Sequence, residues 1–120
     1  MRKLTDHIAN PANDRIEITV MDEPGAGGAH HFYAVHVDHD VEKSMDVHFQ
    51  NGPIAEAGVN GVTQEVLLAI VIDRLRSFQA GPYACKENAE ALAHAEQSLD
   101  WLKSRTKARM ARGVEGTHAA

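Results

Sequence analysis

The chain has 120 residues and a mass of 13.1 kDa, the size of one domain, so a two-domain enzyme is excluded. Its 43% hydrophobic and 24% charged residues are typical of a globular protein and argue against a disordered chain or a membrane protein. The net charge of −5 argues against general affinity for nucleic acid or anionic lipid. The charge is uneven, however: residues 1–60 hold ten acids and four bases, whereas residues 101–112 hold five bases and no acid. A local anion site at this basic end is compatible with an acidic protein.

The single cysteine, Cys85, cannot form a disulfide within the chain, as is usual for proteins of a reducing cytoplasm. Residues 1–13 lack the apolar core of an export signal, and the longest apolar run, residues 66–72, is too short to cross a bilayer. We therefore expect a cytoplasmic protein without a membrane partner.

Three segments in the first half alternate between apolar and polar residues, as half-buried antiparallel strands do. They are residues 15–20, 32–37 and 45–49. The glycine-rich stretch 22–28 predicts a hairpin loop, and the acidic stretch 38–42 predicts the connection before the third strand. The first 14 residues contain the Asn10-Pro11 breaker and little periodicity, so they predict an extended or irregular lead-in.

The second half has helical periodicity. Thr63 is suited to cap a first helix over residues 64–78, which is apolar on every side and must be buried from two directions. A Gly81-Pro82 break follows, and a second helix is predicted from about residue 83 to about residue 112. Its leucines recur at intervals of three and four residues and give it one apolar stripe.

These elements predict an α+β fold in a single domain, 1–120. A small N-terminal antiparallel β-sheet in residues 1–50 is followed by a C-terminal antiparallel two-helix hairpin in residues 51–118. Glycines end the second helix and leave a loosely held tail, residues 113–120. A small sheet and an apolar helix leave more apolar surface than one chain hides, so we expect a homo-oligomer.

Asn88 interrupts the apolar stripe of the second predicted helix. A buried amide without hydrogen bonds costs roughly 1–3 kcal/mol, so this side chain requires polar partners. A structural interpretation gives it the backbone of the Gly81-Pro82 turn. A functional interpretation gives it the base or ribose edge of a nucleotide.

The basic end of this helix is ordered by residue type. Arg105, Arg109 and Arg112 fall on one flank of the helix, and two lysines fall on the other. Planar guanidinium groups suit bidentate phosphate recognition, although bases near a helix C-terminus also complement its dipole. Asn88 and Arg105 are about 25 Å apart along a helix, too far for one small ligand to touch both in one chain. A site containing both requires two chains packed antiparallel.

Five histidines lie in the predicted sheet region: His30, His31, His36, His39 and His48. Metal ligation is chemically possible, but no spacing matches a defined zinc or non-haem iron motif, and a polar, solvated sheet face is the better interpretation. No nucleophile elbow, phosphate-binding loop or metalloprotease motif is present. We expect no metal, no cofactor and no catalytic residue, and we expect Cys85 to be a small core residue.

Four segments of the sequence together resemble a known phage domain. They read FQNGPI at 49–54, GVNGVT at 58–63, FQAGPYACKEN at 78–88 and RMARGVEGT at 109–117. The domain is the helical hairpin shared by phage anti-CBASS and Thoeris anti-defence proteins. Residues 16–37 look like the β-sheet extension of the Thoeris branch, so the chain resembles the first Thoeris anti-defence family.

The resemblance implies a non-catalytic sponge that sequesters nucleotide immune signals. Members assemble as hexamers, capture glycocyclic ADP-ribose between protomers, and in several cases hold CBASS cyclic di- or trinucleotides in separate pockets. The matching ligand residues would be Phe78 for stacking, Asn88 for polar contact, and Arg105 and Arg109 for phosphate. One departure is Tyr83, where the family pattern has phenylalanine in many relatives.

Two interpretations from other classes stand beside the sponge. A small helical nucleic-acid-binding regulator would use the basic residues 103–112 as its footprint, although the net charge counts against it. A purely structural oligomerisation module would bind no nucleotide.

Overall fold

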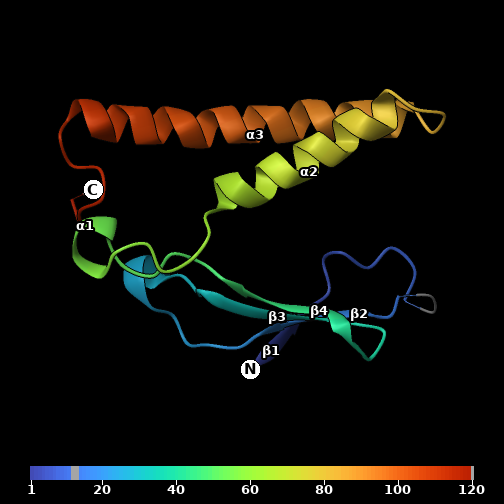
Figure 1. Ribbon diagram of the computed structural model, residues 1–120, viewed down its shortest axis with the longest axis horizontal. Coiled ribbons are helices and arrows are strands. Elements are labelled where there is room, and N and C mark those ends of the chain that lie inside the picture. The colour runs from blue at the N-terminus through green and yellow to red at the C-terminus, as the bar shows by residue number, and fades with distance from the viewer. Residues whose placement is uncertain (12–13, 120) are drawn as a thin grey trace. The chain divides into compact units, whose positions relative to one another are not determined.

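The computed structural model describes residues 1–11 and 14–119. Contacts within it separate two compact units, Met1–Val62 and Thr63–Ala120 (Figure 1). The first unit contains an antiparallel sheet of four strands, and the second contains two long helices. The predicted α+β class is confirmed, and the expectation of a single domain stays a prediction. The sheet unit extends past the predicted boundary at residue 50, because Phe49 pairs with Val62.

The sheet has the strand order β1-β2-β3-β4. The strands are β1 (Arg2–Leu4), β2 (Ile16–Val20), β3 (Phe32–Val37) and β4 (Asp40–His48). Of the extended or irregular lead-in predicted for the first 14 residues, the extended alternative holds for residues 2–4, and the strand pairing of β1 with β2 was not predicted. A strand of three residues is too short to show alternation in the sequence. Residues 12 and 13 of that lead-in lie outside the described residues.

The core of the sheet unit lies at the C-terminal end of β2 and in the middle of β3. Val20 and Ala34 are buried, and Val20 faces Tyr33 across the β2–β3 pair. Branched and aromatic residues of β2 and β3 therefore pack on one another, as their alternation predicts. Met45, opposite Val35 in the register of β3 and β4, remains exposed.

The connection between β3 and β4 is shorter than the acidic stretch 38–42 predicts. Asp38 and His39 form it, with φ angles of 45° and 57°, and β4 begins at Asp40. Two residues in the left-handed region match the twist of a tight hairpin, and aspartate tolerates this conformation better than most residues. The prediction of a longer connection was therefore wrong, because residues 40–42 belong to β4.

A polar clasp closes the connection that follows β4, which contains the one-turn helix α1 (Ile54–Ala57). The Asn51 N–H donates to Asn60 Oδ1 at 2.8 Å, and Asn60 Nδ2 donates to the Asn51 carbonyl at 2.7 Å. The Asn60 N–H also donates to Gln50 Oε1 at 2.9 Å. These side chains replace the missing backbone partners of an irregular segment. The clasp gives a structural role to polar residues in two of the segments that resemble the family, FQNGPI and GVNGVT.

Lys3 and Glu17 form an exposed pair across β1 and β2, with Lys3 Nζ 2.8 Å from Glu17 Oε2. The hydrogen bond and charge of Lys3, helped by His39 and His36, hold the pKa of Glu17 below its ordinary value. A depressed pKa means that the pair's small contribution to stability is present above the ordinary pKa and is lost as the pH falls. We expect Lys3→Ala to raise the pKa of Glu17, measured by NMR titration of its carboxyl carbon. Lys43→Ala on β4 is the control, and an unchanged Glu17 pKa in Lys3→Ala would contradict the assignment.

The helices of the second unit are α2 (Gln64–Gln79) and α3 (Lys86–Ala111). Thr63 caps α2 as predicted, because its side chain accepts a hydrogen bond from the Val66 N–H at 3.3 Å. The helix α3 begins a few residues later than predicted. Gln79 brackets the turn, accepting from the Cys85 N–H at 3.1 Å and donating to the Cys85 carbonyl at 3.2 Å.

Cys85 is exposed, so the prediction of a core cysteine was wrong. Its thiol is the N-cap of α3 and accepts a hydrogen bond from the Asn88 N–H at 3.4 Å. A position that caps a helix lies on the end of the helix rather than on its apolar stripe, which is why the residue type was misleading.

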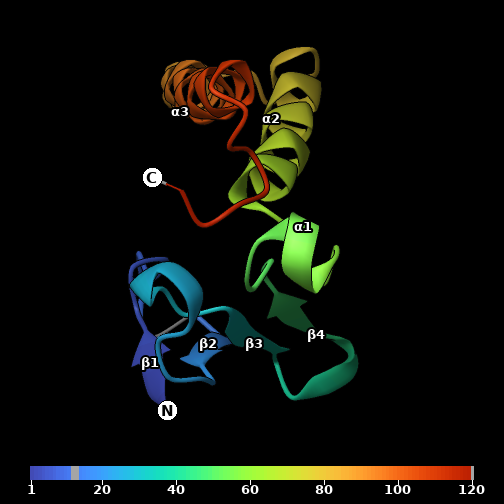
Figure 2. The same cartoon turned by 90° about the vertical axis from the view of Figure 1, so that its left-hand side faces the viewer.

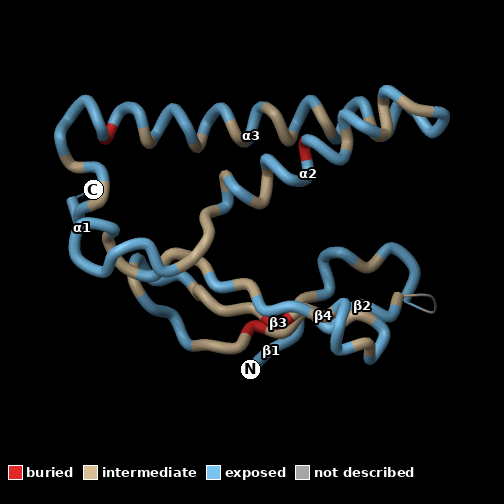
Figure 3. The backbone as a smooth tube through the Cα atoms, in the orientation of Figure 1, coloured by how far each residue is buried: buried red, intermediate tan, exposed pale blue. Residues whose placement is uncertain are grey.

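The chain reverses direction between α2 and α3, and the two helices lie side by side (Figures 1 and 2). Partly buried positions recur along one side of α3 (Figure 3), and they include Leu92, Leu99 and Leu102, as its apolar stripe predicts. On α2 only Ile72 is fully buried among the described residues. The aliphatic residues on the outer side of α2 remain exposed, so α3 covers only one side of α2 and the second covering surface predicted for this helix is not part of the helix pair. They are Val66, Ile70 and Val71.

Candidate functional site

The four predicted ligand residues lie at the two ends of the helix pair. Phe78 is in the last turn of α2 and Asn88 is in the first turn of α3, beside the connecting turn. Arg105 and Arg109 lie near the other end of α3. Because α3 is unbroken from Lys86 to Ala111, Asn88 and Arg105 are about 25 Å apart along its axis. The structure of one chain does not bring these residues together.

Phe78 is half-buried and carries a partner that the sequence analysis missed. The guanidinium carbon of Arg74 lies 4.9 Å from the centroid of the Phe78 ring. The spacing of four residues on one helix was the available signal. Arg74 therefore adds a cation beside the aromatic ring at the turn end of the helix pair.

Asn88 is half-buried, and its backbone N–H is taken by Cys85. Within residues 1–11 and 14–119, its side-chain amide makes no hydrogen bond. The structural interpretation, in which this amide bonds to the Gly81-Pro82 turn, was wrong, and the side chain that bridges the two ends of this turn is Gln79, through the backbone of Cys85. The amide is available to a partner from outside the chain.

The two arginines at the other end differ sharply. Arg105 is exposed and, within the part of the chain that the structure describes, has no ion pair. Arg109 is only 7% exposed, and its Nε donates to Glu115 Oε2 at 3.1 Å. Its two terminal nitrogens donate to backbone carbonyls of the C-terminal segment: those of Val114, Thr117 and Ala119.

The C-terminal segment, residues 113–119, is therefore anchored, and the prediction of a loosely held tail was wrong. The glycines at 113 and 116 adopt φ angles of 73° and 79°, which allow the chain to curl back after α3. The Val114 N–H also donates to the Arg109 carbonyl at 3.0 Å. Burial of Arg109 follows because the acceptors wrap around its guanidinium.

The sheet histidines divide into separate roles. His30 Nδ1 lies 2.7 Å from the Asp22 carbonyl, and His31 Nε2 lies 2.9 Å from the Ala26 carbonyl. The His31 N–H also donates to the Asp22 carboxylate at 2.8 Å and lowers the pKa of that group. His48 stacks on Phe32 with ring centroids 4.3 Å apart. These three histidines stabilise the sheet and its loops.

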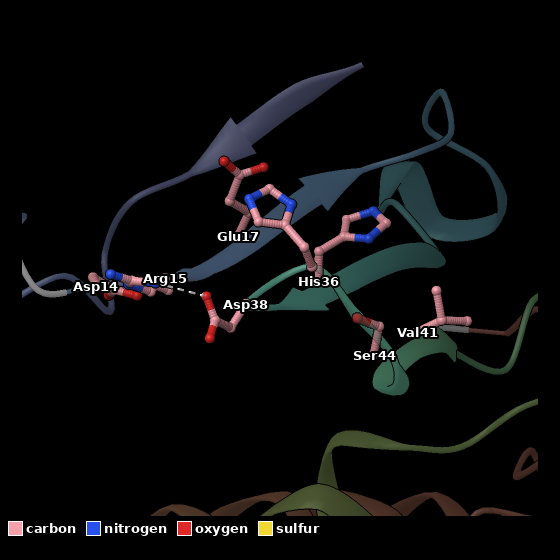
Figure 4. A pocket seen from close by; sticks show the side chains of 8 residues that line it. Asp14, Arg15, Glu17, His36, Asp38, Val41 and Ser44 are labelled. Carbon is pink, nitrogen blue, oxygen red and sulfur yellow. Dashed lines mark hydrogen bonds and ion pairs between the residues drawn. The ribbon is translucent and has the colours of Figure 1, made fainter.

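His36 and His39 line a cavity of about 700 Å³ on the sheet unit (Figure 4). His36 faces Glu17 across β2 and β3, and Arg15 pairs with Asp38 at 3.3 Å. His36 and His48 are exposed while their strand neighbours are half-buried, as predicted, but Ala34 on the same face of β3 as His36 is buried. Among the described residues, no group of three or more histidine, cysteine or acidic side chains is arranged to hold a metal ion.

In the described part of the chain, no helix is both long enough and apolar enough to span a membrane. The longest helix, α3, is interrupted by charged residues throughout its length.

The sequence of the helix pair and of the segment that leads into it matches a described family. A family model named "Acb2/Tad1, hairpin domain" matches residues 42–107, more than half of the chain. The chain belongs to this family of hairpin-domain proteins. Phe78, Asn88 and Arg105 lie inside the matched region, and Arg109 lies just beyond it.

A curated relative is Thoeris anti-defense 1 from Bacillus phage SBSphiJ7. It is 51% identical to this chain over 76 residues, which cover 63% of this chain and 54% of the relative. The chain thus spans about half the length of that relative. The resemblance found in the sequence is confirmed at the level of the family.

Proposed function

We propose that this protein is a phage anti-defence sponge that binds nucleotide immune signals and holds them without cleaving them. Its principal ligand would be the glycocyclic ADP-ribose of Thoeris, with CBASS cyclic di- and trinucleotides as further ligands in separate pockets. Kinship with Thoeris anti-defense 1 supports the role. The observation that carries it is that Phe78 and Asn88 lie beside one end of the 26-residue helix α3 and Arg105 lies near the other, which we interpret as two half-sites.

The chemistry of the half-sites suits binding rather than catalysis. An aromatic ring at Phe78 can stack on a base, and the unsatisfied amide of Asn88 can hydrogen-bond to a base or ribose. Arginine remains charged at all physiological pH values, so Arg105 can neutralise a phosphate but cannot act as a general base. A ligand bound by these groups would be released intact.

The exposed face of α3 supports a second copy of the chain as the partner that completes each site. Eight exposed residues recur on this face at alternating intervals of four and three, the repeat of a helix-packing seam. They are Glu87, Ala91, His94, Ser98, Trp101, Arg105, Ala108 and Arg112. Trp101 is 77% exposed, an unfavourable state for so large an apolar ring and one typical of an interface.

Antiparallel pairing of two α3 helices through this face is self-complementary. If the twofold axis passes between Ser98 and Trp101, Glu87 of each copy lies opposite Arg112 of its partner, and the small Ala91 lies opposite Ala108. Asn88 is then level with residue 111 of the partner, about 3 Å along the axis from Arg109 and about 9 Å from Arg105. We propose that such pairs build two sites per dimer and assemble further into a hexamer.

A charge exchange tests this pairing. We expect Glu87→Arg and Arg112→Glu each to weaken self-association by roughly tenfold, because each places like charges opposite one another. The double variant should restore association. Sedimentation velocity or native mass measurement reports the assembly. Additive loss in the double variant would overturn the proposed register.

The function itself is tested by incubating the purified chain with glycocyclic ADP-ribose, recording the native mass, and then heating the complex. We expect an occupied oligomer and recovery of the unchanged ligand by mass spectrometry. Recovery of a hydrolysed product would show an enzyme, and the absence of bound ligand would remove the sponge. Duplex DNA at two salt concentrations is the matched control, since a nucleic-acid-binding regulator would bind it with a steep salt dependence.

A further inference from the structure

We propose that the C-terminal segment, residues 113–119, is a built-in competitor for the anionic ligand. The carboxylate of Glu115 and three backbone carbonyls occupy the guanidinium of Arg109, so a phosphate that binds Arg109 must displace them. This inference rests on the proposed function for the identity of the ligand and for the role of Arg109 as a phosphate contact. The contacts on which it stands all lie within the second unit.

The hydrogen-bond capacity of Arg109 is nearly exhausted. A guanidinium has five N–H groups, one on Nε and two on each terminal nitrogen. Nε is taken by Glu115, Nη2 is taken by the carbonyls of Val114 (3.0 Å) and Thr117 (3.1 Å), and Nη1 donates to the carbonyl of Ala119. Bidentate recognition of a phosphate uses two N–H groups on one edge. Both edges of the guanidinium that offer two N–H groups include Nη2, so neither edge is free while the segment is docked.

The segment is a small folded structure rather than a chance contact. Thr117 Oγ1 donates to the Val114 carbonyl and accepts from the Ala119 N–H at 3.2 Å. These bonds aim several carbonyl oxygens at one point, the arrangement that binds a cation. Arg109 supplies the positive charge at that point.

Glu115 is the component that an anion can most readily replace. Its side chain is 39% exposed, whereas that of Arg109 is 8% exposed, so the ion pair lies at the edge of the buried site. A phosphate oxygen resembles a carboxylate oxygen in charge and in hydrogen-bond geometry. Exchange of one for the other keeps Arg109 neutralised and releases the segment, which then becomes a mobile strand beside the bound ligand.

The first test is Glu115→Gln, which keeps the shape of the side chain and removes its charge. We expect the variant to bind glycocyclic ADP-ribose and inorganic pyrophosphate roughly three- to tenfold more tightly in calorimetry, since the competing charge is gone. Glu42→Gln on the sheet is the control and should bind as the parent does. Unchanged or weaker binding by Glu115→Gln would overturn the proposal.

The second test reads the segment directly by amide hydrogen exchange of the full chain. The Val114 and Thr117 amides, which are hydrogen-bonded in the free chain, should lose protection when pyrophosphate or glycocyclic ADP-ribose saturates the protein. Retained protection at saturation would overturn displacement.

The two proposals can fail separately. If glycocyclic ADP-ribose does not bind but pyrophosphate binds Glu115→Gln more tightly than the parent, the sponge fails and the competitor stands. If neither the parent chain nor Glu115→Gln binds pyrophosphate, the proposal of a built-in competitor fails, whatever the result with glycocyclic ADP-ribose.

Discussion

Replacement of Arg105 by glutamate should reduce the affinity for glycocyclic ADP-ribose about a hundredfold or more while leaving the fold unchanged. Arg105 is exposed and has no ion pair among the described residues, so its loss removes no contact that holds the helix pair. A charged hydrogen bond to phosphate contributes about 1.5–3 kcal/mol, and the new carboxylate adds repulsion. Calorimetry measures the affinity and circular dichroism shows that the fold persists. The native mass separates a lost ligand contact from a lost pairing, because Arg105 also lies on the proposed seam.

The matched control is Lys103→Glu. It makes the same change of net charge on the same helix but on the opposite flank, where no ligand contact is proposed. We expect at most a few-fold loss, from the long-range field alone. Equal losses in both variants would reduce the role of Arg105 to general charge attraction, and undiminished binding by Arg105→Glu would remove it from the site.

Arg109→Glu is a poorer probe of binding than its sequence position suggests. The new carboxylate would lie among Glu115 and three backbone carbonyls with no cation to neutralise them. Loss of ligand in that variant would report the disordering of the C-terminal segment as much as the loss of a phosphate contact.

Gly61→Ala should destabilise the sheet unit by about 3 kcal/mol or more. A Cβ atom at this position would lie 2.4 Å from the carbonyl carbon of Phe49 and 2.5 Å from the carbonyl oxygen of His48. Both neighbours are backbone atoms of the strand end that pairs with Val62, so they cannot turn aside as a flexible side chain can. Urea denaturation followed by the NMR signals of β3 and β4 measures the loss.

Gly81→Ala is the control for this prediction. Its Cβ would lie 3.5 Å from the Ser77 carbonyl oxygen, an ordinary contact, so we expect a change within about 0.5 kcal/mol. Equal stability of Gly61→Ala and the parent chain would show that the connection between β4 and α2 adapts, and that sterics do not require glycine in the GVNGVT segment.

Local pattern predicted most of the regular structure. Alternation over residues 15–20 predicted β2 to within one residue, and alternation over residues 32–37 predicted β3 with the observed bounds. Thr63 marked the start of α2. The one-turn helix α1 and the strand β1 were not predictable in this way, because one turn or three residues carry no measurable period. The polar clasp was visible only as an unexplained pair of asparagines, Asn51 and Asn60.

The sequence by itself determined the α+β class, the family, and the spacing that keeps Asn88 and Arg105 from sharing a ligand in one chain. The class follows from the order of the elements, the family from the resemblance of four sequence segments, and the spacing from the fixed rise of a helix. Only the tertiary structure decided that the side-chain amide of Asn88 makes no hydrogen bond among the described residues, that Arg74 lies over the Phe78 ring, and that Arg109 is enclosed by the segment after α3. The reason is physical: helical periodicity places side chains only while the helix continues, and Arg109 finds its partners after the helix has ended, where glycines turn the chain back.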